Sequence, residues 1–162
     1  MSEDAPETVC AELIRKMQSL QLSTVNPEGL PDLSYTPYLH RPPNHFYIFV
    51  SQLAAHTRHM LGNPTVSIMV IADEHTSRQI FARTRVMYQC EAIPVSPDAS
   101  NYTVVLDGYQ QRHGKTVALL RQLPDFLLFH LRPVSGRFVM GFGKAYLLTG
   151  EDLSVFEPVR SG

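Results

Sequence analysis

Alternating polar and apolar residues on both sides of a strong turn restrict the fold of this sequence more than any other feature. Residues 20–25 and 30–39 alternate with a period of two, which is typical of half-buried strands. Between them, Asn26-Pro-Glu-Gly29 is a strong turn sequence. The pattern therefore predicts a β-hairpin near the start of the chain.

The same periodicities place the other elements. Further strands are predicted at 46–50, 65–71, 79–93, 126–131 and 137–148. Helices are predicted at 6–19, 52–61 and 98–122, the last divided at Gly108 and Gly114, with a short helix starting at Gly150. Six or seven strands, joined mostly by hairpins and flanked by helices, indicate an α+β fold. An antiparallel sheet of this length closes most readily as a barrel, because closure removes its exposed edges.

Length and composition favour one globular domain over residues 1–162, with a loose N-terminal segment at 1–7 and a short tail at 154–162. The net charge of −1 gives no basic excess for a nucleic-acid partner. Cys10 and Cys90 are the two cysteines, without ligand spacing, so neither a disulfide framework nor a metal site is expected. The acidic N-terminus and the short apolar runs predict a cytoplasmic protein without a membrane partner.

One group of candidate ligands follows a buried strand. Ser51 stands at the predicted strand end, and His56 and Arg58 lie in the helix behind it. A hydroxyl, a helix N-terminus and a guanidinium can together bind a phosphate or a carboxylate. The alternative for this segment is a capped surface helix with a solvated arginine.

A second group surrounds two arginines. If residues 79–93 form a strand, Arg83 and Arg85 share one face with Phe81. Two neighbouring guanidiniums repel unless an anion or carboxylates compensate them, so the pair suits half of a phosphate or propionate clamp, with Arg58 as a candidate third member. The alternative is a solvated barrel face. Asp125 is predicted to cap or turn the chain before a strand, or to orient a histidine.

Glycines interrupt the last long predicted strand. Gly141 and Gly143 favour either a sharp bend of a barrel or room for a flat ligand. The sequence contains no P-loop, GxGxxG, HExxH or GxSxG motif. If the protein is an enzyme, a bound cofactor is therefore expected to carry the chemistry.

The order of these segments resembles a known family. Leu22–Pro31, Ser34–Tyr38, Ser51–Met69, Phe81-Ala-Arg-Thr-Arg85 and Gly136–Tyr146 together resemble the pyridoxamine-phosphate-oxidase-like FMN-binding split barrels, and most closely their haem-utilisation branch. The resemblance runs from about residue 10 to residue 153. It implies an antiparallel split β-barrel and a homodimer with two interface sites, each built from both copies. It also implies haem or FMN as cofactor.

The resemblance leaves three functions open: a haem-binding or haem-degrading protein, an FMN-dependent oxidoreductase, and a non-catalytic haem or flavin carrier. The cofactor-binding residues that it implies are Ser34, Tyr35, Thr36, Ser51, His56, Arg58, Gln79, Arg83 and Arg85. The arginines suit either cofactor, because phosphates and propionates are both anions.

The two cofactors differ in that only haem needs a protein ligand to its iron. The resemblance implies that the axial histidine of the haem-utilising relatives lies in a late tail, beyond the last strand. Asp125 resembles the carboxylate that orients this histidine. The last histidine of this sequence is His130, which leaves three alternatives: the tail is truncated, another histidine serves, or this member does not use haem. His56 and His113 are the internal candidates for another ligand. We therefore expect the chain as given to bind FMN at least as readily as haem, and to hold haem weakly.

Overall fold

One long strand, β7 (Phe126–Gly141), organises the sheet. In the computed structural model of the protein, which describes residues 4–160, β7 pairs with β6 (Arg85–Val95) over nearly its whole length. Its first half also pairs with β4 (His45–Ser51), and its second half with β8 (Lys144–Thr149). All of these pairings are antiparallel. The sheet divides at β7, because β4 and β8 pair with different halves of this strand.

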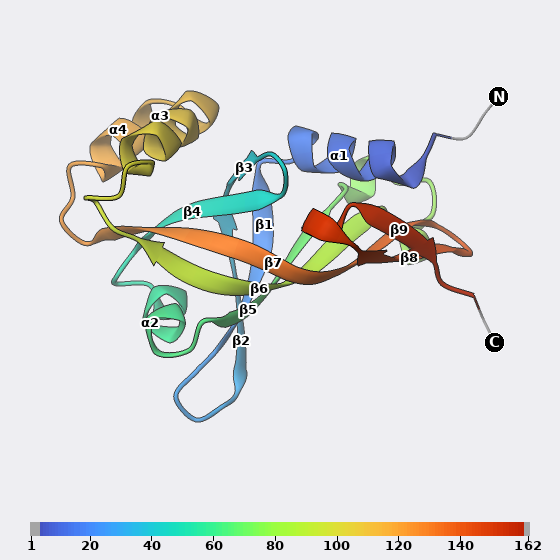
Figure 1. Ribbon diagram of the computed structural model, residues 1–162, viewed down its shortest axis with the longest axis horizontal. Helices are drawn as coiled ribbons and strands as arrows, with labels where there is room; N and C mark the ends of the chain where they lie inside the picture. The colour runs from blue at the N-terminus through green and yellow to red at the C-terminus, as the bar shows by residue number, and fades with distance from the viewer. Residues whose placement is uncertain (1–3, 161–162) are drawn as a thin grey trace.

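The strand order is β2-β1-β5-β6-β7-β4-β3, and β8 and β9 extend from the second half of β7. The remaining strands are β1 (Ser19–Val25), β2 (Pro31–Pro37), β3 (Leu39–Arg41), β5 (Thr65–Ile71) and β9 (Val155–Pro158). Figure 1 shows the sheet strongly curved, with the β1–β2 hairpin projecting from it. The α+β class and the antiparallel sheet predicted from the sequence are confirmed.

Helices flank the sheet on several sides (Figure 1). They are α1 (Pro6–Lys16), α2 (Ala55–Gly62), α3 (Tyr102–His113) and α4 (Lys115–Leu120), with short 3-10 helices η1 (Glu74–Thr76), η2 (Ile80–Ala82) and η3 (Glu151–Leu153). No helix within residues 4–160 is long and apolar enough to cross a membrane.

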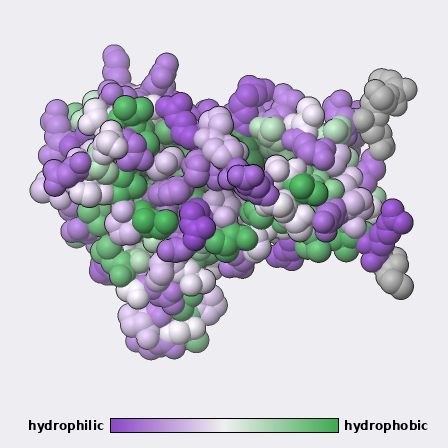
Figure 2. Space-filling view, in the orientation of Figure 1, coloured by the Kyte–Doolittle hydropathy of each residue, from purple (hydrophilic) through white to green (hydrophobic). Residues whose placement is uncertain are grey.

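Two apolar clusters lie on opposite faces of β4, because successive strand residues point to opposite sides. Phe46 and Ile48 belong to the larger cluster, which α1 covers. Tyr47 and Phe49 belong to the smaller cluster, which α3 and α4 cover. This double burial explains why residues 46–50 form an unbroken apolar run. On the face of the molecule shown in Figure 2, hydrophobic and hydrophilic residues are interspersed.

Residues 4–160 form nine strands rather than six or seven, and the predicted boundaries between residues 126 and 148 are wrong. Residues 126–131 and 137–141 form one strand instead of two. Residues 137–148 are two strands, because the chain reverses at Phe142-Gly143, where Gly143 has a φ of +67°. A positive φ is accessible to glycine at little cost, so the glycine pair makes a hairpin turn rather than a bend within one strand.

Residues 79–84 are not a strand. Residues 80–82 form η2, and β6 starts at Arg85. In the helical region, Gly114 separates α3 from α4 with a φ of +89°, whereas Gly108 lies within α3.

The two ends of the chain contribute to the fold more than their sequences suggested. Of the segment 1–7, Pro6 and Glu7 already belong to α1, and residues 1–3 lie outside the described residues. Within the segment 154–162, β9 pairs antiparallel with β8, and residues 161–162 lie outside the described residues.

Candidate functional site

The first group of predicted ligands gathers where α2 meets β2. Ser34 Oγ lies 2.9 Å from His56 Nδ1. Burial lowers the pKa of His56, nearby His59 lowers it further, and Asp32 opposes both. Thr36 is buried, and its hydroxyl donates to the Pro37 carbonyl at 3.1 Å, whereas Tyr35 is exposed on the other side of β2. The structure therefore brings Ser34 and a neutral His56 together, with Tyr35 facing outward.

Ser51 and Asp125 form a second contact beside α2. The Ser51 hydroxyl donates to Asp125 Oδ2 at 2.6 Å, and the backbone N–H of Leu53 donates to Ser51 Oγ at 3.1 Å. Asp125 also accepts, through its carbonyl, from the backbone N–H of Gln52 at 2.7 Å. Asp125 thus ties the start of β7 to the end of β4, as a turn residue would. Its carboxylate contacts a serine, and no histidine among the described residues hydrogen-bonds to it.

Arg58 lies apart from these contacts. Its guanidinium is exposed, and Nη1 donates to the Leu53 carbonyl at 3.3 Å. This is the arrangement of the alternative interpretation, a surface helix with an arginine available to solvent, although no side chain caps α2.

The second group, Gln79, Arg83 and Arg85, lies in and beside the connection between β5 and β6, residues 72–84. Gln79 caps η2 by accepting from the backbone N–H of Phe81 at 3.4 Å. Because η2 replaces the predicted strand, Phe81 and the two arginines do not form one strand face, and Phe81 is 81% exposed.

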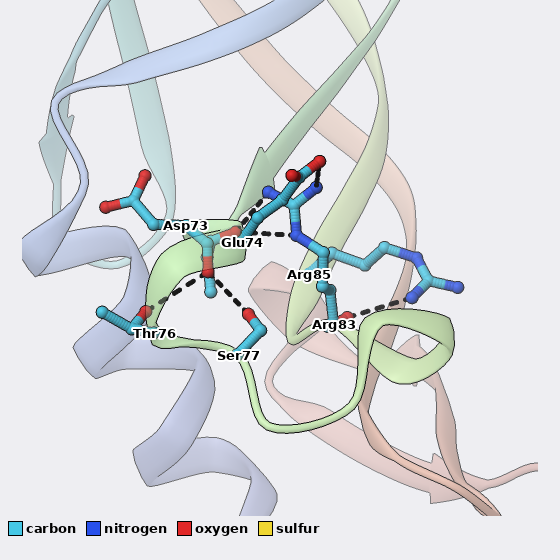
Figure 3. A network of polar contacts seen from close by, with 7 residues as sticks. Asp73, Glu74, Thr76, Ser77, Arg83 and Arg85 are labelled. Carbon is cyan, nitrogen blue, oxygen red and sulfur yellow. Dashed lines mark hydrogen bonds and ion pairs between the residues drawn. The ribbon is translucent and has the colours of Figure 1, made fainter.

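The two arginines have different partners. Arg83 donates through Nε (3.0 Å) and Nη2 to the Ala72 carbonyl, and its Nη1 lies 3.5 Å from Glu74 Oε1. Arg85 donates through Nη1 to the Arg83 carbonyl at 3.0 Å. Figure 3 shows both guanidiniums beside the connection between β5 and β6. The expected pairing of two guanidiniums on one strand face is therefore not found: Arg83 is held by the Ala72 carbonyl and Arg85 by the Arg83 carbonyl.

Within one copy, the two groups do not converge. Helix α2 ends just before Thr65, the first residue of β5, whereas Arg85 pairs with Ile71, its last. Seven strand residues at about 3.3 Å each separate the end of α2 from Arg85 by roughly 20 Å along β5. Ser34 lies across β1 from Ile68, in the middle of β5. Figure 1 shows α2 and the 72–84 connection at opposite ends of β5. Arg58 therefore cannot complete a clamp with Arg83 and Arg85 of the same copy.

A groove of about 350 Å³ lies on the outer face of the sheet. The side chains that line it come from β1, β5 and β6 and from the neighbouring β2, β7 and β8, and they mix apolar and polar types: Leu33, Met69, Met87, Leu147, Gln21, Ser23, Ser67, Gln89 and Arg137. The side-chain oxygen of Gln21 is buried without a hydrogen-bond partner among the described residues.

Sequence reasoning missed this groove. A groove of this kind depends on how neighbouring strands curve relative to one another, which the pattern of residues along a single strand does not report. Within residues 4–160, no group of three or more His, Cys, Asp or Glu side chains could hold a metal ion.

Comparison with known proteins assigns the fold to a class. The family model described as pyridoxamine 5'-phosphate oxidase matches residues 7–140. The chain belongs to this family of split barrels, as its sequence resemblance indicated.

Among its relatives are proteins named for haem. The chain is 38% identical over 151 residues to heme oxygenase HutZ of Vibrio cholerae, which covers 93% of this chain and 85% of that protein. The crystal structure of HutZ, described as a heme storage protein, matches with a TM-score of 0.76 at 31% identity, covering 92% of this chain and 99% of that one. Campylobacter jejuni ChuZ shares the fold with a TM-score of 0.85 at 24% identity, covering 98% of this chain and 64% of that one.

Proposed function

We propose that this protein is a haem-binding protein of the haem-utilisation type, with its cofactor held between two copies of the chain. The observation that carries the proposal is the 38% identity to a heme oxygenase over 93% of the chain. The split-barrel fold and the family match support it.

The side chains near Arg85 fit an anionic cofactor. The Nε and Nη2 atoms of Arg85 have no partner among the described residues, so the edge of the guanidinium that matches two oxygens is available. Arg85 is only partly exposed, which strengthens a charge-assisted hydrogen bond relative to one in open water. A haem propionate or an FMN phosphate would suit this edge.

The separation of the two ligand groups supports a site built from two copies. Arg58 and His56 lie on α2, which ends just before β5 begins, whereas Arg85 pairs with the last residue of β5. A second copy packed on the outer groove would bring the α2 end of one copy toward the arginine end of its partner. The unpaired oxygen of Gln21 and the apolar Met69 and Met87 would then be covered.

FMN is the second candidate. The carboxylate of Asp125 is held by Ser51 rather than by a histidine, so the observed contacts supply no oriented iron ligand there. FMN needs stacking room, polar contacts to its ring and a phosphate site, but no axial ligand. Bound haem would supply redox and oxygen chemistry, and bound FMN would supply electron transfer; the residues named here would bind and orient either group.

Parallel titrations test the proposal. Haem binding is followed by its absorption band and FMN binding by flavin fluorescence, for the unmodified protein and for Arg85→Ala. We expect saturable binding at one cofactor per chain, a haem complex that dissociates readily on dilution, and competition between the two cofactors. Absence of saturable binding of either cofactor would refute the proposal, and FMN binding without haem binding would replace it by the second candidate.

A further inference from the structure

We propose that Arg83 and Arg85 have separate roles. Arg83 holds the two ends of the β5–β6 connection together, and Arg85 alone binds the anionic group of the cofactor. This inference rests on the proposed function, because it assigns roles at that site. It is based on the hydrogen bonds that each guanidinium already makes within the protein, which differ between the two arginines.

Arg83 has no free edge to offer. The Nε and Nη2 atoms of a guanidinium form the edge that matches two oxygens of a carboxylate or a phosphate. In Arg83 both atoms donate to the Ala72 carbonyl, and Nη1 lies beside Glu74 (Figure 3). The side chain is only 21% exposed. To bind an anion through this edge, Arg83 would have to abandon the Ala72 carbonyl, at the cost of two hydrogen bonds.

Arg85 has the opposite arrangement. Only its Nη1 is used, in a hydrogen bond of 3.0 Å to the Arg83 carbonyl. Its Nε and Nη2 have no partner among the residues that the structure describes. The side chain is therefore anchored by one nitrogen, and the edge for two oxygens stays available.

The anchor of Arg85 depends on Arg83. The Arg83 side chain ties residue 83 to residue 72 across the whole connection, next to the backbone hydrogen bond from Ala72 N–H to the Thr84 carbonyl at 2.9 Å. The hydroxyl of Ser77 also donates to the Asp73 carbonyl, at 2.6 Å. The carbonyl that holds Arg85 thus belongs to a residue whose own side chain fixes the connection. Arg83 is a positioning residue, and it acts through Arg85.

A double-mutant cycle separates this division of roles from a clamp in which both arginines bind the anion. The variants are Arg83→Ala, Arg85→Ala and the double variant, and the measurements are haem and FMN affinity and amide hydrogen exchange in residues 72–84. Arg78→Ala is the matched control, since Arg78 is exposed in the same connection and has no partner among the described residues. Exchange in β7 reports whether each variant is folded.

We expect R85A to weaken cofactor affinity by about 10- to 100-fold, the range for a hydrogen bond to a charged group, without faster exchange in the connection. R83A should weaken affinity less and speed exchange in residues 72–84. The double variant should bind as weakly as R85A alone, because Arg83 acts only through Arg85. R78A should change neither affinity nor exchange.

Three results would overturn the inference. If R85A leaves both affinities unchanged, Arg85 does not bind the anion. If the losses in R83A and R85A multiply in the double variant, Arg83 binds the anion directly. If R83A leaves exchange unchanged, Arg83 does not hold the connection together. Failure of the proposed function has its own signature: the unmodified protein binds neither cofactor saturably, while R83A still speeds exchange in residues 72–84.

Discussion

At the scale of residues, burial keeps several histidines neutral, and His130 is the clearest case. Its pKa falls to about 4 because of burial, with further lowering by His45 and Arg132. Its Nε2 lies 2.9 Å from His45 Nδ1, and the ring of Tyr47 stacks on it with centroids 5.0 Å apart. A hydrogen bond between two imidazoles needs a lone pair on one of them, so protonation of both rings would remove it.

This pair predicts how stability depends on pH. Below the ordinary histidine pKa of 6.5 the unfolded chain binds a proton that folded His130 rejects, so stability falls as the pH drops from 6.5 toward 4. Because the ring is only half-buried, we expect a loss on the order of 1 kcal/mol. Urea unfolding between pH 7 and pH 4 should show a shallower dependence for His130→Gln than for His75→Gln, whose histidine is exposed. Equal slopes for the two variants would show that His130 does not titrate in this way.

At the scale of elements, Gly114 decides where one helix ends and the next begins. Its φ of +89° and ψ of −164° separate α3 from α4 in a region that side chains with a Cβ avoid. Gly114→Ala should therefore destabilise the protein by about 1–3 kcal/mol. Gly62→Ala is the control, because Gly62 has no positive φ and an added Cβ would meet nothing within 4 Å. Thermal unfolding measures both variants, and an equal effect of the two would contradict the role assigned to Gly114.

The elements also show what sequence could and could not predict. Short apolar runs located β4 and β5, and side-chain alternation located β1. It failed for β7, since Pro133 and Gly136 resemble a loop. In the structure Pro133 lies at a bulge opposite Cys90, where a missing N–H is tolerated, and Gly136 lies against the ring of Tyr88, where a Cβ would come within 2.8 Å.

The candidate site could likewise be predicted from the sequence only in part. The sequence identified the residue types that suit an anion, and the arginines around residues 83–85 were noticed from their spacing. Which guanidinium edge remains free depends on the Ala72 carbonyl, eleven residues from Arg83, and no local pattern reports that contact. The outer groove depends in the same way on how the strands curve.

At the scale of the whole molecule, the proposed cofactor site requires two copies that meet on the outer groove. Met87 lines the groove opposite Met69 on the neighbouring strand. Met87→Asp would place a carboxylate in the interface, where burying an unpaired charge costs several kcal/mol, and should yield a monomer. Val104→Asp is the control, since Val104 is exposed on α3, away from the groove.

Sedimentation velocity recorded at the haem absorption band tests the central claim most directly, because it reports assembly and cofactor together. After addition of haem, the unmodified protein and Val104→Asp should sediment as dimers that carry the haem signal. Met87→Asp should sediment as a monomer, with the haem signal left unbound. A monomeric unmodified protein that carries haem, or a Met87→Asp monomer that retains it with undiminished affinity, would contradict a cofactor site formed between two copies.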